Sequence, residues 1–379
     1  MIALVTHLWD PAEGGRERYL ADLARGLARS GYAVRVFCER SSRPRTDPSV
    51  SVTIERRGRR LVRRFGAWRA ANPGCPVLSS RPLPGATHCQ LHSGIYAFAL
   101  AAEREAFDSR LRRLFSRPAL ALNRHRSMLL RVEEKVLSGP NPPRLMVWSG
   151  VLRDKIAERY GIPAEEIRVR APGVDLAVFR PAAREPTPAA PGGADLLLLF
   201  AAQNFALKGL RPALEALREA RRLGVRARLL VAGRGPIGPF HRFARRLGLA
   251  EEVEFLGPVS RERLASLYRA CDALLHPTFY DPFSLVALEA LASGCPVITT
   301  RRNGVSEWME SGREGFLLDE PRDVPGLARF LVALAERPSR AGMRKAAAAL
   351  GKRLSLEDHV ADVIAWLDPP LARKETSGR

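Results

Sequence analysis

The sequence has none of the features that tie a protein to an oxidising compartment or to the interior of a membrane. Its cysteines are five in number and show no C-x-x-C spacing, so we expect them to be reduced. No apolar run approaches the roughly 20 residues that span a bilayer. The first residues, Met1–Leu8, lack the basic start of a signal peptide and are predicted to form a strand. We therefore expect a cytoplasmic protein that meets a membrane only from its surface.

An Asp-x-Asp triplet is also absent from the chain. Transferases that hold a nucleotide diphosphate through a metal ion usually need paired carboxylates of this kind. We therefore predict that the protein uses no metal and no other cofactor.

Negative charge is in short supply, because 61 Lys and Arg residues outnumber 40 Asp and Glu residues and give a formal net charge of +21. Such an excess favours anionic partners, which are nucleic acid, acidic lipid head groups or phosphorylated substrates. Only 7% of the residues are aromatic, and no nucleic-acid recognition module appears. We therefore predict no nucleic-acid partner.

Apolar strands and helical patterns alternate along most of the chain. Ile2–Thr6 and Ala33–Phe37 flank a helical repeat, which is the pattern of two parallel strands joined by a helix. Further strands are predicted at Thr87–Leu91, Leu145–Trp148, Leu196–Ala202, Leu229–Ala232, Val253–Leu256, Ala273–His276 and Val297–Thr300, and helices at Tyr96–Phe115 and Leu356–Leu367.

Two domains follow from this pattern, because Phe179–Ala194 is rich in Pro, Ala and Gly and is the clearest linker. The sequence predicts an α/β protein with two doubly wound, Rossmann-like domains that face a central cleft. Residues 1–178 would form the first domain and residues 179–355 the second, with the segment 356–379 crossing back to the first.

Several motifs follow predicted strands, at the carboxyl edges where open parallel sheets bind ligands. In Gly14-Gly15 the missing Cβ atoms let backbone amides approach a phosphate. The lysine of Lys208-Gly209 could neutralise a diphosphate, and Gly233–Pro236 ends another strand in the same manner. His92 follows the strand Thr87–Leu91, although a lone histidine is more often structural.

The stretch from Tyr280 to Val297 is the most informative part of the sequence. Ser284 can cap a helix that runs to Ser293, and within this helix only Glu289 is polar between Leu285 and Leu291. Burying a carboxylate there costs several kcal/mol unless hydrogen bonds compensate it. Asp281 lies at the mouth of the same helix. Two acids beside helical amides that favour anions indicate a polar, phosphorylated ligand.

The second half of the chain resembles the family 4, GT-B type, retaining glycosyltransferases. The resemblance rests on Pro172–Asp175 with Phe179 and Pro181, Lys208-Gly209, Gly233–Pro236, Phe255–Gly257, Asp281 to Glu289, and Asn303-Gly304 with Glu307. Within the family it is most similar to the lipopolysaccharide core glycosyltransferases, which use UDP-glucose or a related donor. The resemblance implies a GT-B fold and a nucleotide sugar as donor substrate.

The resemblance also assigns roles around the donor. Glu289 would hold the ribose hydroxyls, and Asp281 would contact hydroxyls of the donor sugar. The backbone amides of Phe283, Ser284 and Leu285 would meet sugar or phosphate.

Phosphate contacts and catalysis are assigned in the same way. Lys208 would stabilise the leaving diphosphate, with Gly14 and Gly15 closing over the phosphates and Gly233 beside them. His92 matches the residue that lies next to the anomeric centre.

The chain departs from the family pattern at two places. The first acid of the pair is usually Glu and here is Asp281. An arginine commonly accompanies the lysine of the phosphate loop, whereas this chain has Gln203, Asn204 and Leu207. The charge of the diphosphate would then rest on Lys208, with help from Arg234.

Two basic segments in the first half resemble surfaces that lie on membranes. The segment 56–69 contains seven arginines and no acid, with Leu61, Val62, Phe65 and Trp68 interleaved, and the segment 104–131 repeats the theme. The alternative is a solvated, arginine-rich face. The residues predicted to contact the inner leaflet and the acceptor are Arg59, Arg60, Arg63, Arg64, Trp68, Arg112 and Arg113.

The leading hypothesis is therefore a retaining hexosyltransferase. It would move a hexose, with glucose as the first candidate, from a UDP-sugar to a lipid-linked glycan such as lipopolysaccharide core, at the inner face of the cytoplasmic membrane. One alternative is a sugar-nucleotide epimerase of the same architecture. Another is a family member that binds nucleotide sugar with little turnover, as the missing arginine would suggest.

Overall fold

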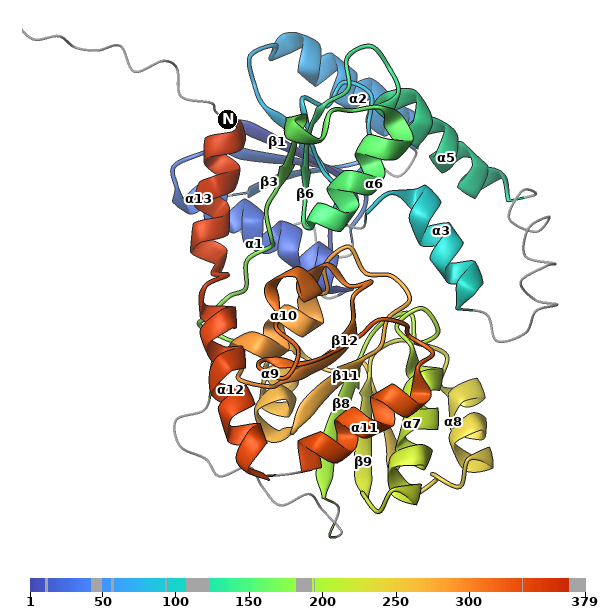
Figure 1. The fold of residues 1–379 in the computed structure, drawn as a ribbon. Helices are drawn as coiled ribbons and strands as arrows, with labels where there is room; N and C mark the ends of the chain where they lie inside the picture. The colour runs from blue at the N-terminus through green and yellow to red at the C-terminus, as the bar shows by residue number, and fades with distance from the viewer. Residues whose placement is uncertain are drawn as a thin grey trace, which may run out of the picture.

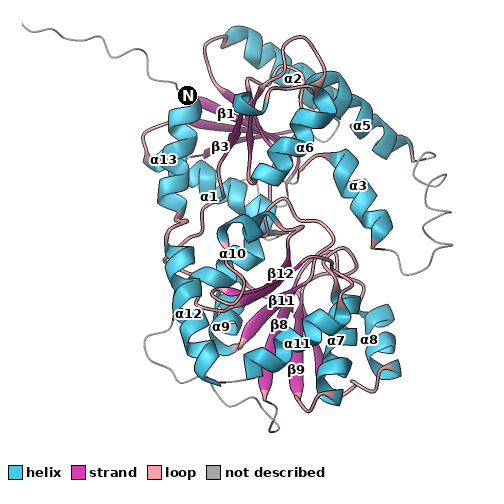
Figure 2. Cartoon of the chain, viewed as in Figure 1, coloured by secondary structure: helices cyan, strands magenta, loops and turns pink. Residues whose placement is uncertain are grey.

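The structure, a computed structural model, describes residues 1–10, 13–41, 50–55, 58–92, 94–106, 123–181, 193, 195–335 and 337–367. Two parallel sheets with helices on their faces lie one above the other in Figure 1, and the cartoon coloured by secondary structure in Figure 2 shows the same layers. The predicted fold class, two doubly wound domains that face each other, is confirmed.

The first half of the chain forms a seven-stranded sheet in the order β3-β2-β1-β4-β5-β6-β7, with every neighbouring pair parallel. Each strand predicted in this half is present, with shifted ends. The strands are β1 (Ile2–Leu8), β2 (Val34–Arg40), β3 (Val50–Ile54), β4 (Val77–Ser79), β5 (His88–Gln90), β6 (Arg144–Val147) and β7 (Ile167–Val169).

The helices of this half cover both faces of the sheet. They are α1 (Gly15–Arg29), α2 (Gly58–Ala71), α3 (Tyr96–Glu105), α5 (Arg124–Leu137), α6 (Gly150–Tyr160) and the short η1 (Ala164–Glu166). The helix predicted at Tyr96–Phe115 is confirmed as far as Glu105. Its second half, with Arg112 and Arg113, lies outside the described residues.

The second half forms a six-stranded parallel sheet in the order β10-β9-β8-β11-β12-β13. Its strands are the predicted apolar runs and one more: β8 (Leu196–Ala201), β9 (Ala227–Ala232), β10 (Val253–Gly257), β11 (Ala273–His276), β12 (Val297–Thr300) and β13 (Gly315–Leu318). The helices are α7 (Leu210–Arg222), α8 (Ile237–Arg246), α9 (Arg261–Ala270), α10 (Leu285–Ala292), η3 (Gly304–Trp308), α11 (Val324–Ala335) and α12 (Arg337–Lys352).

The last helix, α13 (Leu356–Leu367), has the predicted bounds and returns to the first sheet, where Figure 1 shows it beside α1. The hydroxyl of Tyr19 on α1 lies 2.6 Å from Nε2 of His359 on α13. His359 Nδ1 in turn lies 2.8 Å from the backbone oxygen of Ala171. Buried polar contacts as well as apolar packing therefore hold the crossing helix against the first domain.

The segment between the two halves was predicted to be a linker. Residues 182–192 and 194 of that segment lie outside the described residues. The domain limits of 1–178 and 179–355 therefore stay a prediction, although each sheet falls within one of them.

The apolar side of α2 is used by the core of its own domain. Leu61 and Phe65 are buried under the first sheet, and the half-buried ring of Trp68 lies 5.4 Å from that of Phe37. The prediction that Trp68 faces a membrane is therefore wrong, because this helix needs its apolar residues to cover the sheet. Val62, at 55% exposure, remains as an exposed large apolar side chain of this helix.

The arginines of α2 that the structure describes form its outer face. Arg60, Arg63 and Arg64 are exposed, and Arg64 pairs with Glu55. The side chain of Arg59 lies outside the described residues. No helix in the described ranges is long and apolar enough to cross a membrane.

The close packing of α1 against α13 gives a test of the crossing helix. A Cβ atom at Gly26 would lie 2.5 Å from Cγ2 of Val360, so Gly26→Ala should overpack this contact and cost about 1–3 kcal/mol. At the exposed helical position Gly66 a Cβ would meet nothing within 4 Å, so Gly66→Ala should instead stabilise by up to about 1 kcal/mol. Thermal midpoints of both variants check this, and an equal gain in both would contradict the described contact.

Candidate active site

A loop at the carboxyl edge of the second sheet joins β11 to α10 and carries Asp281. The side chain of Ser284 accepts a hydrogen bond from the Ala287 amide at 3.3 Å and caps α10, as predicted. The side chain of Asn303 accepts from the Ser284 amide at 3.1 Å, and the Gly304 amide donates to the backbone oxygen of Asp281 at 2.9 Å. The loop is therefore held rigidly between α10 and η3.

Asp281 and Lys208 form an ion pair at this edge. Nζ of Lys208 lies 2.7 Å from Oδ2 of Asp281 and also donates to the backbone oxygen of Tyr280 at 3.0 Å. Nε2 of the buried His276 lies 3.4 Å from the same carboxylate oxygen. Burial alone would raise the pKa of Asp281, but Lys208 and His276 more than offset it and lower the pKa to about 2. Asp281 is thus ionised at neutral pH and orients Lys208.

The loop that carries Lys208 has no room for another side chain. The next residue, Gly209, has a φ of +82° and begins α7, and a Cβ there would lie 2.0 Å from the backbone oxygen of Pro277. Only glycine combines this conformation with this close approach. The glycine after Lys208 therefore seats the lysine against the end of β11.

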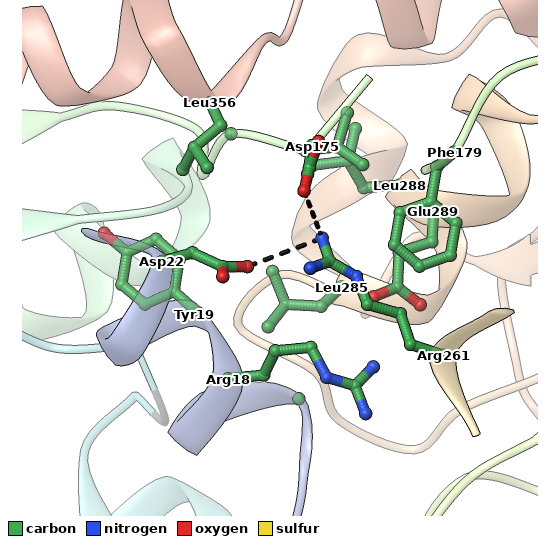
Figure 3. A pocket seen from close by; sticks show the side chains of 13 residues that line it. Arg18, Tyr19, Asp22, Asp175, Phe179, Arg261, Leu285, Leu288, Glu289 and Leu356 are labelled. Carbon is green, nitrogen blue, oxygen red and sulfur yellow. Dashed lines mark hydrogen bonds and ion pairs between the residues drawn. The ribbon is translucent and has the colours of Figure 1, made fainter. Parts of the chain in front are cut away.

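Glu289 projects from α10 into a pocket between the two sheets (Figure 3). Its side chain is buried, and Oε2 accepts a hydrogen bond from the Tyr268 hydroxyl at 3.2 Å. Burial raises the pKa of Glu289 to about 7, against the opposing pull of Arg18 and Arg261. The carboxylate therefore titrates near neutral pH and has acceptor capacity left for a ligand.

The pocket around Glu289 lies where α1 of the first domain meets α10 of the second. Arg261 of α9 bridges two carboxylates there, with Nη2 at 3.0 Å from Asp175 Oδ2 and 3.5 Å from Asp22 Oδ2, as the dashed lines in Figure 3 mark. The lining residues are Gly15, Arg18, Tyr19, Asp22, Gly173, Val174, Asp175, Phe179, Arg261, Leu285, Leu288, Glu289 and Leu356.

The two glycines at the start of α1 are close to the second domain. A Cβ at Gly14 would lie 2.3 Å from Nε2 of Gln203, which donates to the backbone oxygen of Glu13 at 2.6 Å. A Cβ at Gly15 would lie 3.4 Å from Leu285 Cδ1. A side chain at position 14 would therefore require Gln203 to shift, whereas one at position 15 would make ordinary contact. The predicted contact of the glycine pair with phosphate stays a prediction.

Gly233 and Arg234 end β9 at the same cleft. Gly233 has a φ of +130°, and a Cβ there would lie 1.6 Å from the backbone oxygen of Ala202. Arg234 extends across the cleft, and its Nη1 lies 2.6 Å from Oε2 of Glu13. A carboxylate of the first domain therefore neutralises the arginine that was predicted to help bind the diphosphate.

His92 follows β5 and is only 4% exposed. Its ring lies 5.5 Å from that of Tyr19 and 5.3 Å from that of Trp148, and neither ring nitrogen has a hydrogen-bond partner among the described residues. Burial lowers its pKa to about 3, assisted by the positive charge of Arg16. His92 is therefore a neutral polar group, suited to a hydroxyl rather than to a phosphate.

The loop after His92 reaches the loop that carries Asp281. A Cβ at Gly94 would lie 1.9 Å from the Tyr280 hydroxyl and 2.8 Å from Pro282 Cγ. Phe283 is buried behind them, and Leu285 is half-buried at the start of α10. The predicted sugar-binding groups of both domains thus belong to one cleft.

A second hollow, of about 760 Å³, opens at the carboxyl ends of β1, β2 and β3. Arg60, which was predicted to contact the acceptor, lines this hollow. Glu13 also lines the hollow and pairs with Arg234 at the cleft. Its lining residues are Leu8, Asp10, Glu13, Glu39, Arg40, Ser41, Ile54, Glu55 and Arg60.

Sequence reasoning missed several residues that the structure places at the cleft. His276 ends a predicted strand five residues before Asp281, and that position at a carboxyl edge could have revealed it. Arg18, Arg261 and Glu13 gave no signal, because charged residues are frequent throughout the chain. No group of three or more His, Cys, Asp or Glu side chains in the described ranges is arranged to hold a metal ion.

Both halves of the chain match sequence models of known glycosyltransferase families. Residues 13–178 match the sequence model described as Glycosyltransferase Family 4, and residues 195–337 match the one described as Glycosyl transferases group 1. The two matches follow one another along the chain, as the two sheets do.

Similar sequences differ in what they act on. The chain is 37% identical over 202 residues to D-inositol 3-phosphate glycosyltransferase 2 of Catenulispora acidiphila, covering 49% of this chain and 46% of that protein. It is 34% identical over 205 residues to glycogen synthase of Mycobacterium tuberculosis, covering 54% and 48%. The matched part thus spans about half the length of these curated relatives.

Similar solved structures extend over the whole fold. WaaG, a glycosyltransferase involved in lipopolysaccharide biosynthesis, has a TM-score of 0.79 at 21% identity and covers 97% of this chain and 99% of its own. Alr3699/HepE of Anabaena, solved in complex with UDP and glucose, has a TM-score of 0.69 at 19% identity and covers 96% and 99%. At these identities the likeness establishes the GT-B arrangement of the two sheets.

The raised pKa of Glu289 gives a test of the pocket. The ionised carboxylate can accept hydrogen bonds from both ribose hydroxyls, whereas the protonated form loses part of this capacity. UDP binding should therefore strengthen as the pH rises through about 7, where this carboxyl ionises. Calorimetric titration from pH 5.5 to 8.5 measures the effect, and Glu289→Gln should lose this pH dependence and keep only that of the UDP phosphates. Identical profiles for both proteins would contradict the ribose contact.

Proposed function

Because the chain belongs to the group 1, family 4-like glycosyltransferases with the GT-B fold, we propose that it is a retaining hexosyltransferase. Its donor is a UDP-sugar, with glucose as the sugar. Its acceptor is a lipid-linked glycan such as lipopolysaccharide core.

The observation that carries this proposal is the ordered spacing of charge around the cleft. Lys208 is oriented by Asp281 at 2.7 Å in the loop before α10, and Glu289 projects from α10 into the pocket that α10 shares with α1. A nucleotide sugar presents its ribose, diphosphate and sugar in that order. Glu289 suits the ribose, the cation and helical amides suit the diphosphate, and Asp281 suits the sugar.

These residues act on the bond between the anomeric carbon and the diphosphate. As this bond breaks, its electron pair leaves with the diphosphate, and Lys208 neutralises the developing charge. The acceptor hydroxyl forms the new bond to the anomeric carbon and passes its proton to an oxygen of the departing diphosphate. Because Asp281 already fixes Lys208, little reorganisation is needed when the charge develops.

The donor and acceptor are supported to different degrees. The structure of HepE with UDP and glucose supports a UDP-sugar as donor, and the likeness to WaaG favours a glycan of the cell envelope as acceptor. The sequence relatives are named for inositol phosphate and for glycogen. The hollow at the ends of β1 to β3 has carboxylates suited to the hydroxyls of a sugar acceptor.

Turnover with a panel of UDP- and GDP-sugars, with and without membrane extract, tests the proposal. Release of UDP and transfer of labelled sugar should both fall by about 100-fold or more in Lys208→Ala, and should fall in Asp281→Ala and Glu289→Ala. The exposed Lys345→Ala and Asp319→Ala variants are charge-matched controls that should keep full activity.

Other outcomes would identify the alternatives. Transfer that persists unchanged in the three cleft variants would refute the assigned site. Binding of UDP-glucose without any turnover would indicate a nucleotide-sugar-binding protein, for which the neutral Gln203 in the phosphate loop is the motivating observation. Conversion of the donor to another UDP-sugar without acceptor would indicate an epimerase.

Peripheral membrane contact through the arginines of α2 is the second part of the proposal. Arg60, Arg63 and Arg64 share one exposed face, and each cation near an anionic surface contributes about 1 kcal/mol. The chain should therefore float with anionic vesicles more than with neutral ones, and replacing all three by Ala should weaken this binding.

Replacing the exposed Arg242, Arg245 and Arg246 of α8 removes the same charge from the other domain and should have a smaller effect. Equal loss in both triple variants, or no binding of the wild type to either vesicle, would contradict docking through α2.

A further inference from the structure

Arg18 is a cation of the pocket around Glu289 that has not yet been given a role. It lies on α1 about one turn after Gly15 and is half-buried. Figure 3 shows its guanidinium among the residues that line the pocket, on the same side as Arg261 and Glu289. Its charge acts on Glu289 more strongly than that of Arg261, since it is the main cation that opposes the raised pKa of this carboxyl.

The neighbouring arginines are already paired. Nε of Arg16 lies 2.9 Å from Glu17 Oε1, and Arg25 pairs with Asp22. Arg261 is shared between Asp22 and Asp175. In contrast, the guanidinium of Arg18 makes no hydrogen bond or ion pair with any residue of the described ranges.

The position of Arg18 is costly for a cation in two respects, although the nearby carboxyls of Asp22, Glu262 and Glu289 attract its charge. The beginning of a helix carries partial positive charge, so a cation in the first turns is unfavourable. Half-burial removes part of the hydration of the guanidinium as well. An anionic ligand in the pocket would compensate both effects, and a planar guanidinium binds phosphate oxygens in pairs.

On the opposite side of the loop at residues 13–15 lies a neutral residue, Gln203. Gln203 approaches this loop from the phosphate-binding side of the second domain and donates to the backbone oxygen of Glu13. Its amide is neutral, so it adds no charge for a diphosphate. Arg18 lies just beyond this loop along α1, in the same pocket as Glu289.

We infer that Arg18 binds the phosphate that is attached directly to the ribose of the donor nucleotide, while Lys208 serves the terminal phosphate. The inference rests on the proposed function, because it places the ribose on Glu289. The first phosphate is bonded to the ribose through one carbon and so must lie next to it. The two phosphates are then held by cations from different domains, Arg18 from the first and Lys208 from the second.

Binding of uridine, UMP and UDP separates these roles. Arg18→Ala should weaken both UMP and UDP by about 10- to 100-fold, the usual range for a lost hydrogen bond to a charged group, and leave uridine unchanged. Lys208→Ala should weaken UDP much more than UMP. Arg29→Ala removes an exposed charge from the same helix and should leave all three affinities unchanged.

The outcomes distinguish this inference from the proposed function. UMP affinity in Arg18→Ala equal to that in Arg29→Ala would overturn the role of Arg18 while leaving the proposed function intact. An equal loss for uridine and UMP would also overturn it, because Arg18 would then act through Glu289. A wild-type protein that binds no nucleotide at all would overturn both. Arg18→Lys, which keeps the charge, should retain part of the UMP affinity, and thermal midpoints verify that each variant is folded.

Discussion

Two carboxylates, one in the loop before the short apolar helix α10 and one on this helix, are the constraint on which the site depends. Asp281 remains ionised because Lys208 and His276 surround one of its oxygens. Among the described residues, Glu289 accepts a side-chain hydrogen bond from the Tyr268 hydroxyl alone, and its pKa rises to about 7. The loop before α10 thus presents an acid that is satisfied within its own domain, and α10 itself presents one that is poised for a ligand. Burial without full compensation is costly in any core and is retained where binding needs it.

The first domain completes this arrangement through very close contacts. Gly14 lies against Gln203 and Gly94 lies against Tyr280, and a Cβ at either place would require the neighbouring side chain to shift. Further along α1, helix α13 packs against it at Gly26. Small residues therefore occur both where the cleft closes and where the chain crosses back, and the loops at the strand ends meet with little space between them.

Local chemistry made much of this fold predictable. The helix from Leu285 to Ala292 was found because Ser284 caps it and Gly294 follows it in the left-handed conformation. Strands of the second sheet are continuous apolar runs, whereas β4 has only three residues and was missed. Asp281 and Glu289 stood out as polar residues in an apolar stretch. Arg18 could not be identified in this way, because one arginine does not stand out in a sequence rich in arginine. Its place in the pocket is set by tertiary packing, which the sequence pattern does not show.

The ion pairs across the cleft share one polarity. Glu13, Asp22 and Glu105 of the first domain meet Arg234, Arg261 and Arg302 of the second. In a chain with a net charge of +21, these three ion pairs attract the two halves to each other despite the overall repulsion. Mobile ions screen such attraction beyond about 8 Å at physiological ionic strength. Because these three pairs are in direct contact, at 2.6 to 3.5 Å, salt screens the long-range repulsion of the net charge more than it screens the pairs.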